Sequence, residues 1–288
     1  MAKVTDTYTS SSGVIVVLCD CTPPRSGDPA ALDRVGVVNA DFICVAYNPG
    51  KLARADSVAA AYTIKERTGK DVVFNMATRD MNKIAVQSRL LGAQMMGLEN
   101  VVVLQGDGFT ETEAELVKTV GDFTPTGLVG AISVMNEGLD YRGSKLRGAT
   151  DFCIGATLDL ERDLRGEVRL TQRKVAAGAH YFIAQPIYDL GLRQRFLEAY
   201  EEQVGGPLTT PVFWGLQVLD VDGIVLGNVP PGMRQELDGG RAGSDIAGEL
   251  LQQYVEAGIR GVYLVPPILR GGARDYEAAQ QVLESIET

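Results

Sequence analysis

Acidic and amide side chains stand at the ends of short apolar segments, where they could take part in chemistry. Asp20 lies inside the apolar run VVLCDC, and Asp107 follows the run VVVLQG. A carboxylate is costly to bury unless it is paired or used, so Asp20 is a candidate general acid. Gln185, in IAQPIYD, offers the donor and the acceptor that an amide-like heterocycle edge requires.

Each of these residues also has a structural interpretation that the sequence leaves open. Asp20 could be held by backbone amides, Asp107 could cap the N-terminus of a helix, and Gln185 could cap a loop. Other chemistries find little support. The single histidine, His180, precedes a strand-like run and is interpreted as structural, which leaves no His-rich metal site. The four cysteines lie in apolar runs without a CxxC pair, so buried reduced thiols are expected.

The composition indicates an ordinary globular protein that binds neither nucleic acid nor membrane. The chain has 288 residues, of which 45% are hydrophobic and 22% are charged, and its formal net charge is −10. Nucleic acids and anionic membranes attract clustered Lys and Arg, so this acidity argues against both partners. No apolar run approaches the roughly 20 residues of a membrane span, and the first residues do not resemble a signal peptide. A cytoplasmic protein is expected, and its oligomeric state is open.

Eight β-rich apolar runs alternate with helical stretches and predict the fold. The runs begin near residues 14, 42, 72, 101, 152, 181, 212 and 262. Most spacings are about 30 residues, the length of one strand–helix unit, so the pattern predicts a single (β/α)8 TIM barrel over residues 13–288 after a polar tail at 1–12. An open doubly wound sheet would need a Gly-rich turn after the first strand, which CTPPRSGD does not provide.

Two longer spacings contain insertions, at about residues 123–150 and 219–243. Both are predicted to be loops at the C-terminal rim of the barrel that cover a substrate. The polar residues at the strand ends should converge on the same rim. These residues include Asp20, Tyr47, Asn75, Gln105, Asp107 and Gln185.

Four stretches, taken in order, resemble the methylenetetrahydrofolate reductase family. They are DCTPPRSGD, AYNPGKLARADSVAAAYTIKERTG, ATRDMNKIAVQSRLLGAQMMGLENVVVLQGD and RKVAAGAHYFIAQPIYD. The resemblance implies an enzyme that reduces 5,10-methylenetetrahydrofolate to 5-methyltetrahydrofolate, in one-carbon metabolism and methionine biosynthesis. Asp20 matches the family's catalytic Glu, which protonates N10 and opens the substrate to an N5 iminium. The shorter side chain of Asp20 moves the proton donor by about 1.5 Å.

The resemblance also assigns the substrate contacts. Asp107 matches the carboxylate that supports the pterin and the developing cation, and Gln185 matches the pterin-binding Gln. Tyr188 is a further predicted substrate contact. Arginines of the expected rim loops are candidates for the polyglutamate tail of the folate, although solvated surface charge is the simpler interpretation of each. These arginines are Arg142, Arg147, Arg234, Arg241 and Arg270.

Departures from the family cluster at its flavin site. Where flavin-binding members have Thr, His, Arg and Tyr, this chain has Ala46, Asn75, Gln105 and Ala156. Each lost hydrogen-bonded group removes about 1–3 kcal/mol of binding, so flavin binding is predicted to be weak or absent. NADH or NADPH would then deliver hydride directly, and the sequence does not choose between them. The predicted cofactor contacts are Tyr47, Asn75, Gln105, Arg173 and Lys174.

Two other functions remain open. The chain could be a folate-binding methyl-transfer barrel that works with a corrinoid partner, which needs no NADH and has less need of an acid at Asp20. It could also be a non-catalytic folate-binding subunit of a larger reductase, in which the altered flavin positions reflect lost activity.

Overall fold

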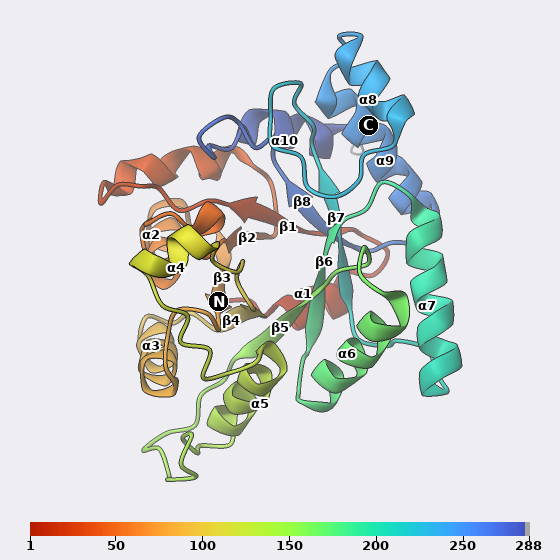
Figure 1. Ribbon diagram of the computed structural model, residues 1–288. Helices are drawn as coiled ribbons and strands as arrows, with labels where there is room; N and C mark the ends of the chain where they lie inside the picture. The colour runs from red at the N-terminus through yellow and green to blue at the C-terminus, as the bar shows by residue number, and fades with distance from the viewer. Residues whose placement is uncertain (286–288) are drawn as a thin grey trace.

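A computed structural model describes residues 1–285 of the chain. Within these residues, eight parallel strands form a closed barrel in sequence order (Figure 1). The barrel closes where β1 pairs with β8, with Val16 opposite Gly261. The strands are β1 Val16–Cys21, β2 Phe42–Val45, β3 Asp71–Ala77, β4 Asn100–Leu104, β5 Cys153–Leu158, β6 Tyr181–Pro186, β7 Val212–Gln217 and β8 Gly261–Val265. The predicted (β/α)8 barrel is confirmed.

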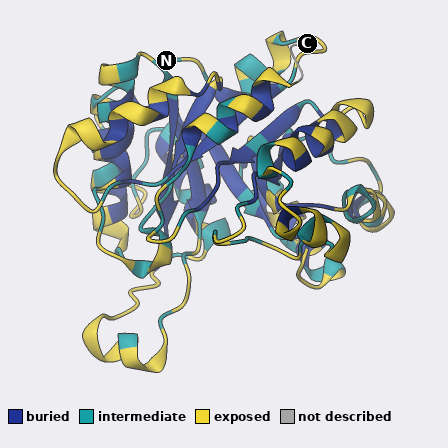
Figure 2. Ribbon diagram, turned by 90° about the horizontal axis from the view of Figure 1, so that it is seen from above, coloured by how far each residue is buried: buried dark blue, intermediate teal, exposed yellow. Residues whose placement is uncertain are grey.

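Helices surround the barrel and bury one face each against it, while their outer faces are exposed (Figure 2). They are α2 Ser57–Thr68, α3 Lys83–Met95, α5 Pro125–Asn136, α6 Leu164–Ala176, α7 Leu190–Val204, α9 Gly243–Glu256 and α10 Tyr276–Glu284, with the short 3-10 helices η1 Pro29–Val37 and η2 Pro49–Lys51 in the loops after β1 and β2. Side chains of Asp56, Asn82 and Thr124 cap α2, α3 and α5 by accepting hydrogen bonds from backbone N–H groups. These caps fix where each helix leaves the C-terminal end of the barrel.

Strand residues alternate between the barrel interior and the helical layer, because successive side chains point to opposite faces of a strand. Val16 and Leu18 pack in the interior cluster, whereas Val17 and Cys19 pack under the helices. Asp20 follows Leu18 by two positions, so it points into the barrel near its C-terminal end.

The prediction that the first insertion lies at the C-terminal rim is wrong for residues 137–150. Residues 137–150 connect α5 to β5, so they lie at the N-terminal end, away from the rim that should bear a site. The segment PTGLVGAISVMN, expected to be part of a loop, forms helix α5, whose apolar residues and glycines do not show the pattern of a surface helix. The long C-terminal loop of this unit is instead residues 105–124, which carries the short helix α4 Glu111–Leu116 and projects from the body (Figure 2). The second insertion does follow β7 at the C-terminal end and carries α8 Pro231–Asp238.

The expected polar tail contains helix α1, Val4–Ser10, which lies across the N-terminal end of the barrel (Figure 1). Val4 is fully buried in the interior cluster, and the ring of Tyr8 meets Phe213 edge to face at 5.7 Å. Only these two inward side chains distinguish the helix from a polar tail in sequence, which explains why it was missed.

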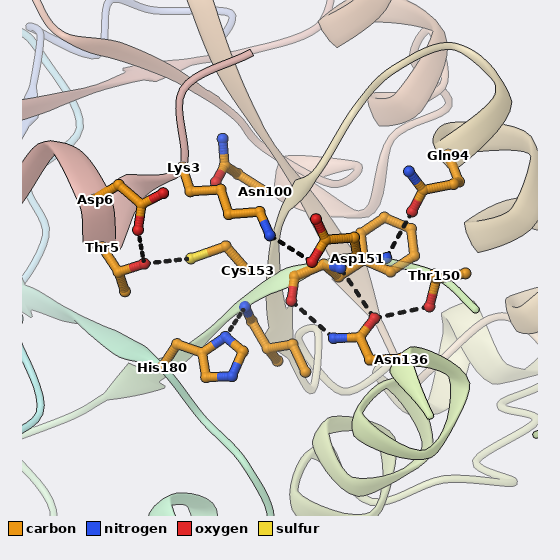
Figure 3. A network of polar contacts seen from close by, with 12 residues as sticks. Lys3, Thr5, Asp6, Gln94, Asn100, Asn136, Thr150, Asp151, Cys153 and His180 are labelled. Carbon is orange, nitrogen blue, oxygen red and sulfur yellow. Dashed lines mark hydrogen bonds and ion pairs between the residues drawn. The ribbon is translucent and has the colours of Figure 1, made fainter. Parts of the chain in front are cut away.

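A polar network at the same end of the barrel includes His180 (Figure 3). Its Nδ1 accepts a hydrogen bond from the backbone N–H of Ile154 at 3.0 Å. Nearby, Asn136 donates to the carbonyl of Phe152 and accepts from its N–H, which joins α5 to β5. The histidine therefore ties strand ends together far from the C-terminal rim, in agreement with its predicted structural role.

Candidate active site

A cavity of about 520 Å³ opens at the C-terminal end of the barrel, bounded by β2 to β6 and their loops. Seven of the nine residues predicted to form a site line it. They are Tyr47, Asn75, Gln105, Asp107, Arg173, Lys174 and Gln185. The strand-end residues converge because the carboxyl ends of all strands in a parallel barrel meet at one rim, whereas Arg173 and Lys174 reach the cavity from α6. The other two predicted residues, Asp20 and Tyr188, lie outside the cavity lining.

Gln185 and Asp107 reach the cavity from different sides. Gln185 is the single exposed residue of the otherwise buried strand β6, so its amide is available to a ligand. Asp107 follows Gly106, whose φ of +82° turns the chain sharply after β4. Asp107 does not cap α4, because Thr110 does so and forms a capping box with Glu113. The helix-cap alternative for Asp107 is therefore wrong, and its carboxylate is free to meet a ligand.

Arg79 holds the backbone of Asp107 and was not identified from the sequence. Its Nε and Nη2 bind the two carboxylate oxygens of Asp80 at 2.6 and 2.8 Å, and its Nη1 donates to the carbonyl oxygen of Asp107 at 2.8 Å. The guanidinium also lies over the ring of Phe109, 4.5 Å from its centroid. The segment ATRD at the end of β3 was the available signal, because it places an Arg–Asp pair directly after a strand.

Tyr47 and Asn75 line the cavity on the β2 and β3 side. Burial, the charge of Asp80 and a hydrogen bond to Asp80 raise the pKa of Tyr47 to about 12, so its phenol stays protonated at neutral pH. Asn75 accepts a hydrogen bond from the thiol of Cys44 at 3.4 Å. Tyr47 and Asn75 therefore present neutral polar groups to the cavity.

The opposite wall carries positive charge. Lys174 is 4% exposed; its ammonium donates to the carbonyl of Thr157 and lies 3.9 Å from Glu167. Burial lowers the pKa of Lys174 and raises that of Glu167, because their mutual attraction offsets only part of the cost of desolvation. Arg162 and Arg173 line the same wall, together with the first turn of α5. Cationic side chains beside a helix N-terminus suit an anionic ligand.

The positions assigned to the family's flavin contacts do not all face the cavity. Ala46, Asn75 and Gln105 line it, but the side chain of Ala156 packs outward into the core beneath the helices. Thr157, one residue later, lines the cavity instead. Ala46 offers no polar side chain, and Gln105 offers an amide without charge.

Asp20 is 4% exposed and is held by two side chains from the β8 end of the chain. Its Oδ1 accepts a hydrogen bond from the hydroxyl of Tyr263 at 2.7 Å, and its Oδ2 accepts from Nε of Arg274 at 2.8 Å. Burial alone would lower the pKa of Arg274, but the charge and hydrogen bond of Asp20 outweigh it and the pKa is raised. The alternative of a carboxylate held by backbone amides is wrong. In this arrangement, Asp20 accepts hydrogen bonds and is not among the residues that line the cavity.

Tyr188 is buried and fastens a loop. Its hydroxyl lies 3.1 Å from both Oε1 of Gln217 and the carbonyl of Leu226. Gln217 in turn donates from Nε2 to the carbonyl of Ile224 and accepts from the N–H of Leu226. Tyr188 and Gln217 therefore hold the loop after β7, and the predicted contact between Tyr188 and substrate has no support in the cavity geometry.

The fold and the cavity agree with a sequence comparison. The profile of the family described as methylenetetrahydrofolate reductase matches residues 8–219, well over half of the chain. The chain belongs to the methylenetetrahydrofolate reductase family. No curated protein matches the sequence significantly. Membership of the family supports a folate-related function.

Solved structures share the architecture. An uncharacterized protein from Clostridium thermocellum that binds two copies of 5-methyl-5,6,7,8-tetrahydrofolic acid superposes with a TM-score of 0.64 at 13% identity, over 99% of this chain and 98% of that one. DmoA from Hyphomicrobium sulfonivorans gives a TM-score of 0.50 at 8% identity, over 88% of this chain and 84% of its own. At these identities, the likeness concerns the fold.

None of the helices within residues 1–285 combines the length and the hydrophobicity of a membrane span. The same residues hold no group of three His, Cys, Asp or Glu side chains arranged to bind a metal ion.

Proposed function

We propose that the protein reduces 5,10-methylenetetrahydrofolate to 5-methyltetrahydrofolate with hydride from NADH or NADPH. One observation carries the proposal. Gln185 from β6 and Asp107 from the loop after β4 line one cavity, and both match the family's pterin contacts. The opposite wall of this cavity bears Arg173 and Lys174. A neutral heterocycle and an anionic nucleotide could therefore bind side by side.

The amide of Gln185 can donate to and accept from the edge of the pterin at the same time. The carboxylate of Asp107 can accept from ring N–H groups and stabilise positive charge at N5 as the substrate ring opens. Arg79 holds the backbone at Asp107 in place through its bond to the carbonyl oxygen, which keeps this carboxylate at the cavity edge.

The residues of the cavity fit a nicotinamide dinucleotide better than a flavin. Arg173, which has no ion-pair partner within residues 1–285, and the first turn of α5 offer cationic and N–H groups to phosphates, while Arg162 and Lys174 line the same wall but pair with Asp159 and Glu167. A bound nicotinamide supplies a hydride for the methylene carbon. Ala46 and Gln105, by contrast, replace a hydroxyl and a charge that flavin-binding members use.

Asp20 is the proposed proton donor to N10. In this step, the proton moves from the carboxyl group to N10, the bond between N10 and the methylene carbon breaks, and the N5 iminium forms. Since Arg274 pairs with the carboxylate in the free protein, bound substrate must draw Arg274 away before Asp20 can take up a proton from solvent. Tyr263 then keeps the carboxyl group in position.

A turnover assay tests the proposal. The purified protein is incubated with methylenetetrahydrofolate and either NADH or NADPH, with and without added FAD, and 5-methyltetrahydrofolate is quantified by mass spectrometry. We expect product without added flavin and no flavin absorbance in the purified protein. A stoichiometric bound flavin whose removal abolishes turnover would refute direct transfer.

Two variants assign the roles. Gln185→Ala should weaken folate binding at least tenfold, whereas Gln194→Ala, on the exposed face of α7, should leave binding unchanged. Asp20→Asn should abolish reduction while folate still binds. Unchanged reduction by the Asp20→Asn protein would exclude Asp20 as the general acid.

A non-catalytic folate-binding role is the second candidate, because both oxygens of Asp20 already accept hydrogen bonds. The Clostridium thermocellum neighbour, which binds the product form of the folate, supports folate binding by this fold. Folate binding without reduction by NADH, NADPH or added flavin would establish this alternative.

A further inference from the structure

Three arginines from three different loops lie near one another at the C-terminal rim, and one of them pairs with Asp20. Arg25 follows β1, Arg54 follows β2 and Arg274 follows β8. Arg54 donates from Nη1 to the carbonyl of Pro23, which brings it beside the loop of Arg25. Both Arg54 and Arg274 also lie against Gly272. Arg274 donates a hydrogen bond to the carbonyl oxygen of Gly272 at 3.2 Å. Nη2 of Arg54 lies so close to this glycine that a Cβ added at residue 272 would be 2.8 Å from it. We call Arg25, Arg54 and Arg274 the arginine cluster.

The cluster carries more positive charge than its surroundings balance. Asp20 pairs with Arg274, but within residues 1–285 neither Arg25 nor Arg54 has an ion-pair partner. Burial lowers the pKa of Arg54, and the charges of Arg274 and Arg25 lower it further, because both repel the guanidinium group of Arg54. A chain with a net charge of −10 thus concentrates unpaired cations at one place. Such an arrangement is expected where an anion binds.

The arginines of the expected rim loops already have ion-pair partners or lie elsewhere. Arg234 pairs with Asp238, Arg241 with Glu236 and Glu249, and Arg270 with Asp222. Arg142 and Arg147 belong to the segment between α5 and β5, at the opposite end of the barrel. The cluster is therefore the better candidate, and it was hidden because its members are scattered along the sequence.

The cluster adjoins the cavity. Nε of Arg54 donates to the carbonyl oxygen of Pro49 at 3.4 Å, and Pro49 lines the cavity. A ligand with its head in the cavity can therefore pass Pro49 and reach Arg54. In a folate, N10 bears the p-aminobenzoyl group and the glutamates, so protonation of N10 by Asp20 would start the tail beside Arg274, the partner of Asp20.

We infer that the arginine cluster binds the carboxylates of the glutamate tail of the folate. The inference rests on the proposed function, because the position of N10 beside Asp20 comes from it. Carboxylates spaced along a flexible chain match guanidinium groups held on separate loops, and each can accept two parallel hydrogen bonds. Binding of the tail also offers Arg274 a carboxylate in place of Asp20, which links tail binding to the release of Asp20.

Tail length and two arginine variants provide the test. Dissociation constants are measured by calorimetry for monoglutamyl and triglutamyl 5-methyltetrahydrofolate. We expect the triglutamate to bind about tenfold more tightly to the wild-type protein, as one additional charge-assisted hydrogen bond would give. Arg54→Gln should remove most of this gain, and Arg25→Gln should remove part of it. Arg67→Gln, which breaks an exposed ion pair with Asp33 on the outside of α2, should leave it intact.

Three results would overturn the inference. The first is an undiminished gain in both cluster variants. The second is an Arg54→Gln protein whose KM for NADH is raised while its preference for the triglutamate over the monoglutamate is unchanged. That result would assign the cluster to the phosphates of the cofactor.

The third result applies if no folate binds, so that the proposed function itself fails. The γ-linked triglutamate peptide alone is then titrated and followed by NMR. Shifts that appear with the wild-type protein and are lost in Arg54→Gln would uphold a polycarboxylate site. Absence of shifts with the wild-type protein would overturn it.

Discussion

The ion pair between Asp20 and Arg274 makes a quantitative prediction about stability that is independent of activity. Their side chains are 6% and 7% exposed, and Tyr263 supplies a second donor to the carboxylate. Removal of one member of a buried pair typically costs about 3–5 kcal/mol, because the partner is left buried and uncompensated. Asp20→Asn keeps the shape and some hydrogen bonding, so we expect a loss at the lower end, about 3 kcal/mol. In thermal unfolding this loss corresponds to a decrease in Tm of about 5 °C or more.

A double-mutant cycle isolates the pair. Arg274→Gln and the Asp20→Asn/Arg274→Gln double variant are unfolded in urea beside the single Asp20→Asn variant. Because the double variant leaves no buried charge unpaired, it should be less destabilised than the sum of the singles by about 2 kcal/mol. The matched control is Arg270 with Asp222, a pair with side chains 82% and 70% exposed, for which no measurable coupling is expected. An Asp20→Asn protein as stable as the wild type, or additive single effects, would refute the reasoning.

Three further predictions concern other parts of the barrel. Burial lowers the pKa of His180 below its ordinary 6.5, and protonation would break the hydrogen bond that its Nδ1 accepts from Ile154. The free energy of unfolding should therefore rise with pH between that lowered pKa and 6.5. His180→Ala should flatten this dependence, as measured by urea unfolding between about pH 5 and pH 7.5. Gly155→Ala should destabilise the protein by about 1–3 kcal/mol in the same assay, since the new Cβ would lie 2.5 Å from Cζ of Tyr181, and normal stability would contradict the packing. Arg79→Lys should weaken folate binding about tenfold, as measured by calorimetry, because lysine cannot form the bidentate pair with Asp80. An unchanged affinity for folate would exclude Arg79 as a positioning residue.

Periodicity made the barrel predictable. A strand–helix unit has a characteristic length, so repeated spacings revealed all eight strands, and each strand begins within two residues of its expected position. Residues at strand ends then had to converge, which brought Gln185 and Asp107 into one cavity. The insertion before β5 was misplaced because α5 is apolar throughout and lacks the polar face that marks a surface helix.

The environment of Asp20 could not be predicted in the same way. Its partner Arg274 is 254 residues away, and nothing in the spacing of either residue indicates the pair. The contacts of Tyr188 were unpredictable for a related reason, because its partner Gln217 and the carbonyl of Leu226 belong to a later unit. Contacts between loops of different units depend on the conformations of those loops, which short sequence patterns do not specify.

Direct hydride transfer is tested most directly by an isotope. Flavin-free protein is given methylenetetrahydrofolate and NADH carrying deuterium at the transferred position of nicotinamide C4, and the product is examined by mass spectrometry. The proposed mechanism predicts one deuterium in the methyl group of 5-methyltetrahydrofolate, at the enrichment of the NADH supplied. Methyl product without deuterium would show that the hydride passed through a carrier that exchanges with water, and absence of product with either nicotinamide would contradict the reductase function itself.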